Sequence, residues 1–191
     1  MLALAGRTAS WCNTQPWKTY VTGRAATRRL AAALSEAART GVRSPDLPWP
    51  SSYAGVYRTR RQEAGYGLYE AVGVRRDDRE ARARQALLNF EFFGAPHTAV
   101  ITSDRELGTY GAVDCGGYVA NLLLAATSLG IATVAQAAIA SVSAVVRAEL
   151  GLPEDRVVVC AVSFGYADES DPINGFRTTR ASLDETVHWV D

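Results

Sequence analysis

The sequence predicts an α+β fold in which helices cover a mixed β-sheet. Three stretches have the alternation or the apolar character of strands, and they are separated by longer stretches with helical periodicity. The regular βαβ alternation of a parallel sheet is missing. Apolar residues make up 48% of the 191 residues and charged residues 21%, as in an ordinary globular protein. Because this length suits one domain, we expect a single domain over residues 1–191.

The first quarter of the chain predicts a helix end, a strand, a helix and a loop. Residues 2–9 begin with four apolar residues and contain Gly6, as the last turn of a helix does. Residues 17–22 alternate and carry β-forming side chains, which predicts a strand. Residues 24–40 place leucines and alanines at helical spacing, whereas residues 44–53 hold three prolines and predict a loop.

The middle of the chain predicts two helices, a strand and a long central helix. Residues 56–71 and 77–90 form the two helices, and Gly94-Ala95-Pro96 ends the second. Residues 97–103 have the β-branched composition of a strand. Residues 111–129 form the long helix, which carries almost no charge.

No charged residue occurs from Cys115 to Val146. A run of this length could span a membrane. Polar side chains and Gly130 interrupt it, so we expect no membrane segment here. A helix that is apolar on all sides is also typical of one that is deeply buried or shared between two subunits. We favour this second interpretation.

The last third predicts a loop, a short helix, a buried strand and a terminal arm. The loop covers residues 130–137 and the helix runs from Val142 to Leu150, before a glycine and a proline. Residues 156–164 are an unbroken apolar run, typical of a central strand with both faces buried. Residues 181–189 form the arm.

Charge and motif content exclude several classes of function. The twenty basic residues, all arginine except Lys18, are balanced by twenty acidic ones, so no net field attracts nucleic acid. Three separate cysteines form no CxxC pair, and the two histidines lie outside any zinc motif. GxGxxG, P-loop and GxSxG motifs are absent. No signal peptide is recognisable, which predicts a cytoplasmic protein.

The most informative stretch is residues 9–17, ASWCNTQPW, between a predicted helix end and a predicted strand. Ser10, Asn13 and Gln15 offer neutral hydrogen-bonding groups, and Trp11 and Trp17 offer flat apolar surface. This combination suits a flat heterocycle with polar edges. An ordinary polar turn with both tryptophans in the core explains the same residues about equally well.

Residues 10–17 resemble the SxxNxQPW motif of the nitroreductase family of FMN enzymes. Further segments are similar to the family in the same order, from about Ala3 to the end of the chain. They are Arg60-Arg61 before Gly67-Leu68-Tyr69, NFEFFGAP at 89–96, the 114–121 segment, GIAT at 130–133 and NGFRTTR at 174–180.

The resemblance implies an obligate, interlocked homodimer with a mainly antiparallel sheet and two FMN sites at the subunit interface. It places Ser10, Trp11, Asn13 and Gln15 in the motif that reaches the partner's flavin. It also implies that the backbone of Ala135, Gln136 and Ala137 lies beside the ring, with an amide N–H near N5, where hydride arrives and leaves.

The same resemblance implies phosphate contacts and a substrate wall. Arg177 and Arg180 match the arm that binds the FMN phosphate, where a forked guanidinium makes strong contacts. Phe92 and Phe93 match a region that lines the substrate pocket, although core packing explains them nearly as well. We expect no catalytic side-chain acid or base, so protons would come from solvent.

One family feature is missing from this sequence. Members usually begin with a helix that carries an RRSxR motif, whereas this chain starts at Met1, inside the end of a later helix. Either the start lies upstream of Met1 or the chain is a shortened member with a weakened FMN site.

The expected function is reduction of nitroaromatics, quinones or similar electron-poor compounds, with NAD(P)H as co-substrate and FMN as cofactor. The alternative is a degenerate member that dimerises but binds flavin weakly and is not catalytic. A branch of the family that performs oxidation or dehalogenation is a third reading.

Overall fold

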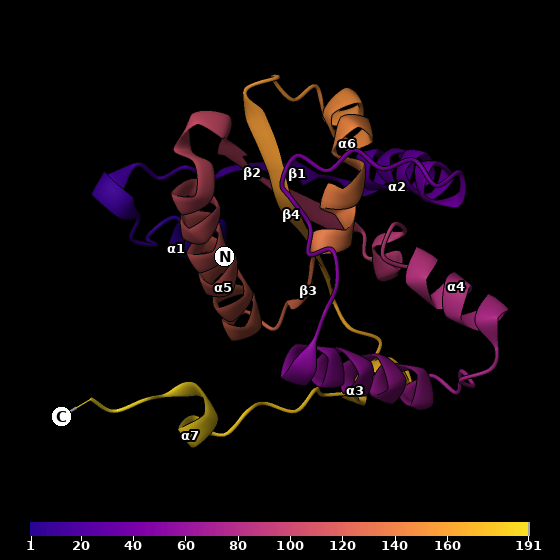
Figure 1. Cartoon of the computed structure of the whole chain (residues 1–191). Coiled ribbons are helices and arrows are strands. Elements are labelled where there is room, and N and C mark those ends of the chain that lie inside the picture. Colours follow the sequence, from indigo (N-terminus) through magenta and orange to yellow (C-terminus); the bar gives the residue numbers. More distant parts are fainter. Residues whose placement is uncertain (191) are drawn as a thin grey trace. The chain divides into compact units, whose positions relative to one another are not determined.

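A computed structural model describes residues 1–190 and contains one four-stranded sheet (Figure 1). The spatial order of the strands is β1-β2-β4-β3, and all three pairings are antiparallel. The strands are β1 (Lys18–Thr22), β2 (His97–Asp104), β3 (Ala132–Gln136) and β4 (Arg156–Gly165). Within the described residues the sheet therefore has no parallel pair, where the sequence predicts a mixed sheet that is mainly antiparallel.

Contacts divide the chain into two compact units. Residues 1–49 and 84–167 form the first, which contains the whole sheet. Residues 50–83 and 168 onward form the second, which contains α3 (Gly55–Ala71), η5 (Pro172–Gly175) and α7 (Leu183–Thr186). Helix α4 (Arg79–Leu87) includes residues of both.

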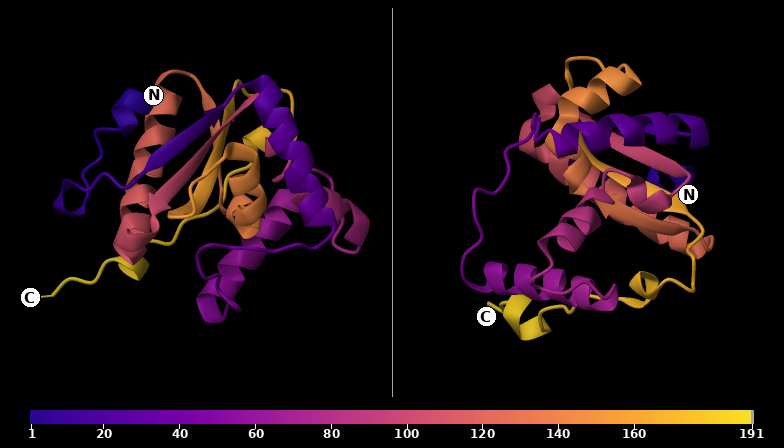
Figure 2. Two further views of the ribbon diagram at one scale, coloured as in Figure 1. Left: turned by 90° about the horizontal axis from the view of Figure 1, so that it is seen from above. Right: turned by 90° about the vertical axis from the view of Figure 1, so that its right-hand side faces the viewer.

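Helices cover both faces of the sheet in the first unit (Figure 2, left). Helix α5 (Gly108–Ser128), with the short α1 (Leu2–Ala5) against it, packs on one face, where Ile101, Leu122 and Val162 form a core. The other face carries α2 (Arg24–Arg39), η2 (Phe92–Gly94), η4 (Ala137–Val142) and α6 (Ser143–Leu150). The alternation of side chains along each strand supplies both cores.

Strand β4 confirms the prediction of a central buried strand. It lies between β2 and β3, and Val158, Ala161 and Val162 are fully buried. The prediction of a loop at 130–137 was wrong, because residues 132–136 form the edge strand β3. Alanines at 132 and 135 lower the β-propensity of this segment, and pairing along β4 overrides that weak local preference.

Helix α5 is buried on one side only. Cys115, Tyr118 and Leu122 face the sheet and are at most 3% exposed, whereas Tyr110, Val113 and Leu124 are 61–69% exposed. The sequence predicts either deep burial or sharing between subunits, and within the single chain this side of the helix is not buried. Within residues 1–190 no helix is both long and apolar enough to cross a membrane.

The second unit is held by contacts between α3 and the segment after residue 168. A Cβ atom at Gly67 would lie 2.9 Å from the Phe176 ring, so glycine lets the ring pack against the helix. The Arg60 guanidinium lies 3.4 Å from the Glu185 carboxylate, and Arg76 lies over the Tyr66 ring at 3.7 Å.

Candidate functional site

The turn at residues 10–16 has an unusual backbone conformation. Cys12, Asn13 and Gln15 have φ values of 48°, 57° and 45°, in the left-handed region that side chains other than glycine rarely adopt. The Gln15 amide N–H donates to Ser10 Oγ at 2.9 Å, and Gln15 Nε2 donates to Asn13 O and Asn13 Oδ1 at 3.2 Å. The predicted site residues thus brace one another, and such conformations are common at functional sites.

Helix α5 holds this turn in place. The Trp11 amide N–H donates to Asp114 Oδ2 at 3.0 Å, and the Trp11 ring stacks on Tyr110 with centroids 6.1 Å apart. Trp11 nevertheless remains 68% exposed, which excludes a core role in the single chain. Trp17 instead packs against the core and stacks on Tyr118 at 5.1 Å.

The second predicted contact region lies at the edge strand β3. Ala135 and Ala137 are exposed and present only methyl groups, so a flat ligand could approach the backbone here. Gln136 between them is 2% exposed. Its Nε2 donates to the Asn89 carbonyl at 2.7 Å, and its Oε1 accepts from the Ser163 hydroxyl.

One chain does not bring the turn and the β3 edge together. The turn leads into β1, and β1 and β3 are the two opposite edges of the sheet. Neighbouring strands lie about 4.8 Å apart, so three spacings separate these edges by about 14 Å. Within one copy of the chain, Ser10 and Asn13 therefore lie toward the opposite edge of the sheet from Ala135 and Ala137.

The two phenylalanines before β2 have different environments. Phe92 is fully buried in the core, which matches the core-packing alternative, whereas Phe93 is 40% exposed. Their φ values are 54° and 52°, again left-handed. Only Phe93 has free surface with which to contact a substrate.

Arg177 and Arg180 lie in the second unit and are exposed. The Arg177 guanidinium donates to the carbonyls of Asn174 and Phe176, both at 2.8 Å. Arg180 donates to the Thr179 carbonyl at 2.8 Å and to Thr178. Within residues 1–190 neither guanidinium pairs with a carboxylate, so both are available to bind an anion.

Burial keeps the thiols of two cysteines outside the turn in the neutral form. Burial raises the pKa of the Cys115 thiol to about 11 and that of Cys160 to about 12. His97 lies at the start of β2, where its Nδ1 is 3.1 Å from the Thr22 carbonyl. Among residues 1–190 no cluster of histidine, cysteine and carboxylate side chains could hold a metal ion.

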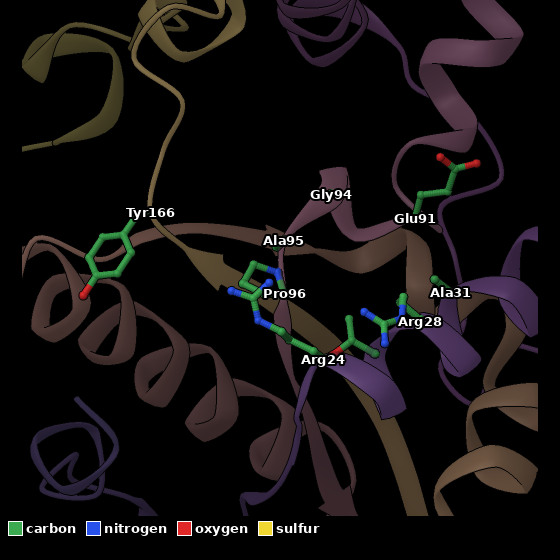
Figure 3. A pocket seen from close by; sticks show the side chains of 9 residues that line it. Arg24, Arg28, Ala31, Glu91, Gly94, Ala95, Pro96 and Tyr166 are labelled. Carbon is green, nitrogen blue, oxygen red and sulfur yellow. The ribbon is translucent and has the colours of Figure 1, made fainter.

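A pocket of about 420 Å³ lies elsewhere in the first unit, between the start of α2 and the segment before β2 (Figure 3). Arg24 and Arg28 project from α2 into its lining, with Pro96, Glu91 and Tyr166 also present. It lies near the end of β1, because Thr22 pairs with Thr98. None of the predicted site residues lines this pocket.

Sequence reasoning missed three residues that shape the candidate site. Asp114 carried a usable signal, because it is the only charged residue of α5. Tyr110 lies one helical turn before Asp114, on the same face of the helix, so the two residues could have been recognised together. Asn89 acts through its backbone carbonyl, so its residue type carried no signal for that contact.

Comparisons with known proteins agree with this geometry. The model of the Nitroreductase family matches residues 1–166. Nitroreductase NfnB of Mycolicibacterium smegmatis is 38% identical over 187 residues, which cover 97% of this chain and 80% of that protein. A 4-nitrobenzoate reductase of Nocardioides sp. strain LMS-CY is 37% identical over 196 residues, with 100% and 79% covered.

Two solved structures are similar to the chain along nearly its whole length. The FMN-dependent nitroreductase NfnB from Mycobacterium smegmatis, in complex with NADPH, has a TM-score of 0.93 at 38% identity and covers 99% of this chain and 85% of its own. The FMN- and NADPH-dependent NfnB from Sphigopyxis sp. strain HMH has a TM-score of 0.95 at 30% identity, with 100% and 86% covered. By sequence and by fold, this chain belongs to the nitroreductase family.

Proposed function

We propose that the chain is an FMN-dependent oxidoreductase that uses NAD(P)H to reduce nitroaromatic, quinone or similar electron-poor compounds. The relatives at 37–38% identity are named as a nitroreductase and a 4-nitrobenzoate reductase, and the similar structures are described as FMN- and NADPH-dependent. The observation that carries the proposal is the braced, exposed turn at Ser10–Gln15, whose residues match the family motif.

The residues at the two sheet edges fit the chemistry of FMN. Ser10, Asn13 and Gln15 supply neutral donors and acceptors for the polar edge of the ring, and Trp11 supplies flat surface. The methyl side chains of the β3 edge allow the close backbone approach that an amide donor to N5 requires. When bound, FMN supplies the two-electron carrier between NAD(P)H and the acceptor.

We place the FMN phosphate at Arg177 and Arg180. Their guanidinium groups have no carboxylate partner within residues 1–190. They donate to exposed backbone carbonyls, which could bond to water instead when a phosphate binds the guanidinium groups. An FMN phosphate offers a stronger, charge-assisted acceptor for such forked donors. We propose that solvent delivers the protons, because the carboxylate next to the turn, Asp114, already accepts a hydrogen bond from the Trp11 amide.

The proposed assembly is a homodimer in which the turn of one copy meets the β3 edge of the other. Two observations support it. In one copy, the turn adjoins the β1 edge of the sheet, and the proposed flavin-contacting backbone lies at the opposite, β3 edge. The exposed side of α5, with Tyr110, Val113 and Leu124, is apolar and adjoins the turn through Tyr110 and Asp114. A surface of this kind is typical of an obligate interface.

We also propose that residues 1–191 act as one domain and that the protein is cytoplasmic. The family match at 1–166 runs without interruption through residues of both units, which supports a single domain. The cytoplasmic location rests on the sequence alone.

Flavin absorbance tests the proposed function. The purified chain, mixed with FMN and freed of excess, should be yellow, and NADPH or NADH should bleach it without oxygen. Added 4-nitrobenzoate should then restore the colour and be consumed. A protein that stays colourless in excess FMN would contradict the proposal and favour the non-catalytic alternative, for which the relatives give no support.

A further inference from the structure

The buried amide of Gln136 links three separate segments of the first unit. Gln136 ends β3, Ser163 lies in β4, and Asn89 precedes η2. Gln136 Nε2 donates to the Asn89 carbonyl at 2.7 Å, and Gln136 Oε1 accepts from the Ser163 hydroxyl. An amide at 2% exposure that is engaged at both ends has little capacity left for a ligand.

The chemistry of its partners fixes which way this amide points. The Asn89 carbonyl can only accept, so it must face the NH2 group of Gln136. That choice leaves the Gln136 oxygen for the Ser163 hydroxyl, which can donate. Alternation along β3 then directs the Ala135 side chain away from the core, and Ala135 and Ala137, the first residue of η4, are both exposed.

The segment that Gln136 holds has a costly backbone conformation. Phe92 and Phe93, three and four residues after Asn89, both have left-handed φ values. The Phe93 amide donates to the Leu88 carbonyl at 2.9 Å, which closes a tight loop around Asn89. Two successive aromatic residues keep such a conformation only when their surroundings enforce it. The buried ring of Phe92 is one anchor, and the Gln136 amide is the other.

We propose that Gln136 is a positioning residue that sets the place of the exposed Phe93 ring relative to the β3 edge. This inference rests on the proposed function, in which the β3 edge lies beside the flavin and Phe93 contacts the substrate. The Gln136 backbone is part of that edge. Its side chain donates a hydrogen bond to the Asn89 carbonyl, in the segment that leads to Phe93. A single residue therefore connects the β3 edge, beside the proposed flavin, with Phe93, the proposed substrate contact.

Hydrogen exchange in the flavin-free protein tests this role without any activity measurement. Gln136→Met keeps the length of the side chain and removes both hydrogen bonds. We expect the protection factors of the amides at 92–95 to fall by about tenfold, as expected for loss of one net hydrogen bond. Ser163→Ala is the matched control, because it leaves the bond to Asn89 in place and should change these protection factors less than about twofold.

A second variant covers the case in which Gln136→Met fails to fold. Gln136→Glu keeps the shape, but an ionised carboxylate cannot donate to the Asn89 carbonyl, whereas a protonated one can. Burial raises the pKa of this carboxyl, so protection at 92–95 should be close to that of the wild type in acid and fall as the pH rises through that pKa. The wild type should show no such dependence.

Kinetics of the flavin-loaded enzyme extend the test. Gln136→Met should raise KM for 4-nitrobenzoate several-fold, because the acceptor contacts Phe93, whereas Ser163→Ala should leave this KM within about twofold of the wild-type value. Unchanged protection at 92–95 in both variants would overturn the proposal. Weaker FMN binding with intact protection would also overturn it, because Gln136 would then be a direct ligand of the flavin. A wild type that binds no FMN would instead contradict the proposed function, while the exchange result would stand.

Discussion

The backbone amide of Trp11 donates to the carboxylate of Asp114, 3.0 Å away, and so fixes the strained turn to the central helix. Asp114 is the only charged residue in α5, and it bonds the turn where the exposed apolar side of the helix begins. The turn, the helix and the proposed interface are thereby one connected structure. A change at Asp114 should consequently affect both the turn and flavin binding.

We expect Asp114→Ala to lower the free energy of unfolding by about 1 kcal/mol, because it removes one charge-assisted hydrogen bond in an exposed setting. FMN affinity should fall by a larger factor than stability alone explains, since the turn loses its fixed position. Asp114→Asn is the control, because its amide oxygen can still accept from Trp11. Urea unfolding and FMN titration measure the two effects. Equal FMN affinity in all three proteins would contradict this role for the turn.

Phe92 and Phe93 should respond to substitution in opposite ways. Phe92→Ala should cost about 3–5 kcal/mol of stability, the usual range for removing a buried aromatic ring. Phe93→Ala removes a ring that is 40% exposed, so its main effect should be a raised KM for the nitroaromatic acceptor. Thermal unfolding and steady-state kinetics on both variants provide the comparison. If Phe93→Ala had unchanged kinetics, Phe93 would not be part of the substrate wall.

The sequence predicted those elements whose residues interact locally or lie in long apolar runs. The largely apolar run at 156–164 identified β4, because burial on both faces favours apolar side chains along the whole strand. The long helix was clear because charge is almost absent from it over several turns. Strand β3 was missed because its short, alanine-rich segment depends on pairing with β4, and long-range pairing leaves little local trace.

The candidate site was only partly predictable, for a similar reason. Ser10, Asn13 and Gln15 were recognised from their motif. Asparagine adopts the left-handed region more readily than most residues, but the residue types of Cys12 and Gln15 give no sign of their left-handed φ values. The bond from Gln136 to the Asn89 carbonyl joins residues 47 apart and uses a backbone acceptor. Such contacts exist only once the sheet and the η2 segment have packed.

Arg177→Ala should weaken FMN binding about tenfold or more without changing the unfolding midpoint, because this exposed guanidinium is proposed to hold the phosphate and contacts only nearby carbonyls. Arg58→Ala is the matched control, since Arg58 is also exposed and lies in the second unit but outside the predicted arm. Riboflavin, which lacks the phosphate, should bind the wild type and Arg177→Ala equally. Unchanged FMN affinity in Arg177→Ala would remove Arg177 from the phosphate site.

Leu124→Asp should dissociate the proposed dimer into monomers, and the monomers should lose their flavin. Leu124 is 69% exposed on the apolar side of α5, and an unpaired carboxylate buried in an interface costs several kcal/mol, enough to raise the dimer dissociation constant about a hundredfold. Val42→Asp changes a half-exposed side chain in the loop after α2 and should leave the dimer intact. Analytical ultracentrifugation with detection at the flavin band follows both species. A flavin-loaded monomer would contradict the composite site.

The thiols of the buried Cys115 and the partly buried Cys160 predict that stability falls in mild alkali. Burial holds the pKa of Cys115 at about 11 and that of Cys160 at about 12, against an ordinary value of 9.0. Above pH 9 the unfolded chain therefore releases protons that the folded chain keeps, which favours unfolding. The stabilisation is complete below pH 9 and is lost as pH rises toward these folded-state values, by up to about 1.4 kcal/mol per pH unit for each thiol.

Urea unfolding with a reductant from pH 7.5 to 10.5 measures this slope. Cys160→Val removes one titrating group and should flatten the decline, because the valine side chain is apolar at every pH. Val159→Ala, at the neighbouring position, should lower stability equally at all pH values, since it removes no proton. The Cys115 thiol also donates to the Thr102 carbonyl at 3.8 Å, so Cys115→Ala should flatten the decline and cost some stability at neutral pH as well. A decline of the same steepness in wild type and Cys160→Val would mean that Cys160 already ionises in the folded protein, and so that it is reached by water.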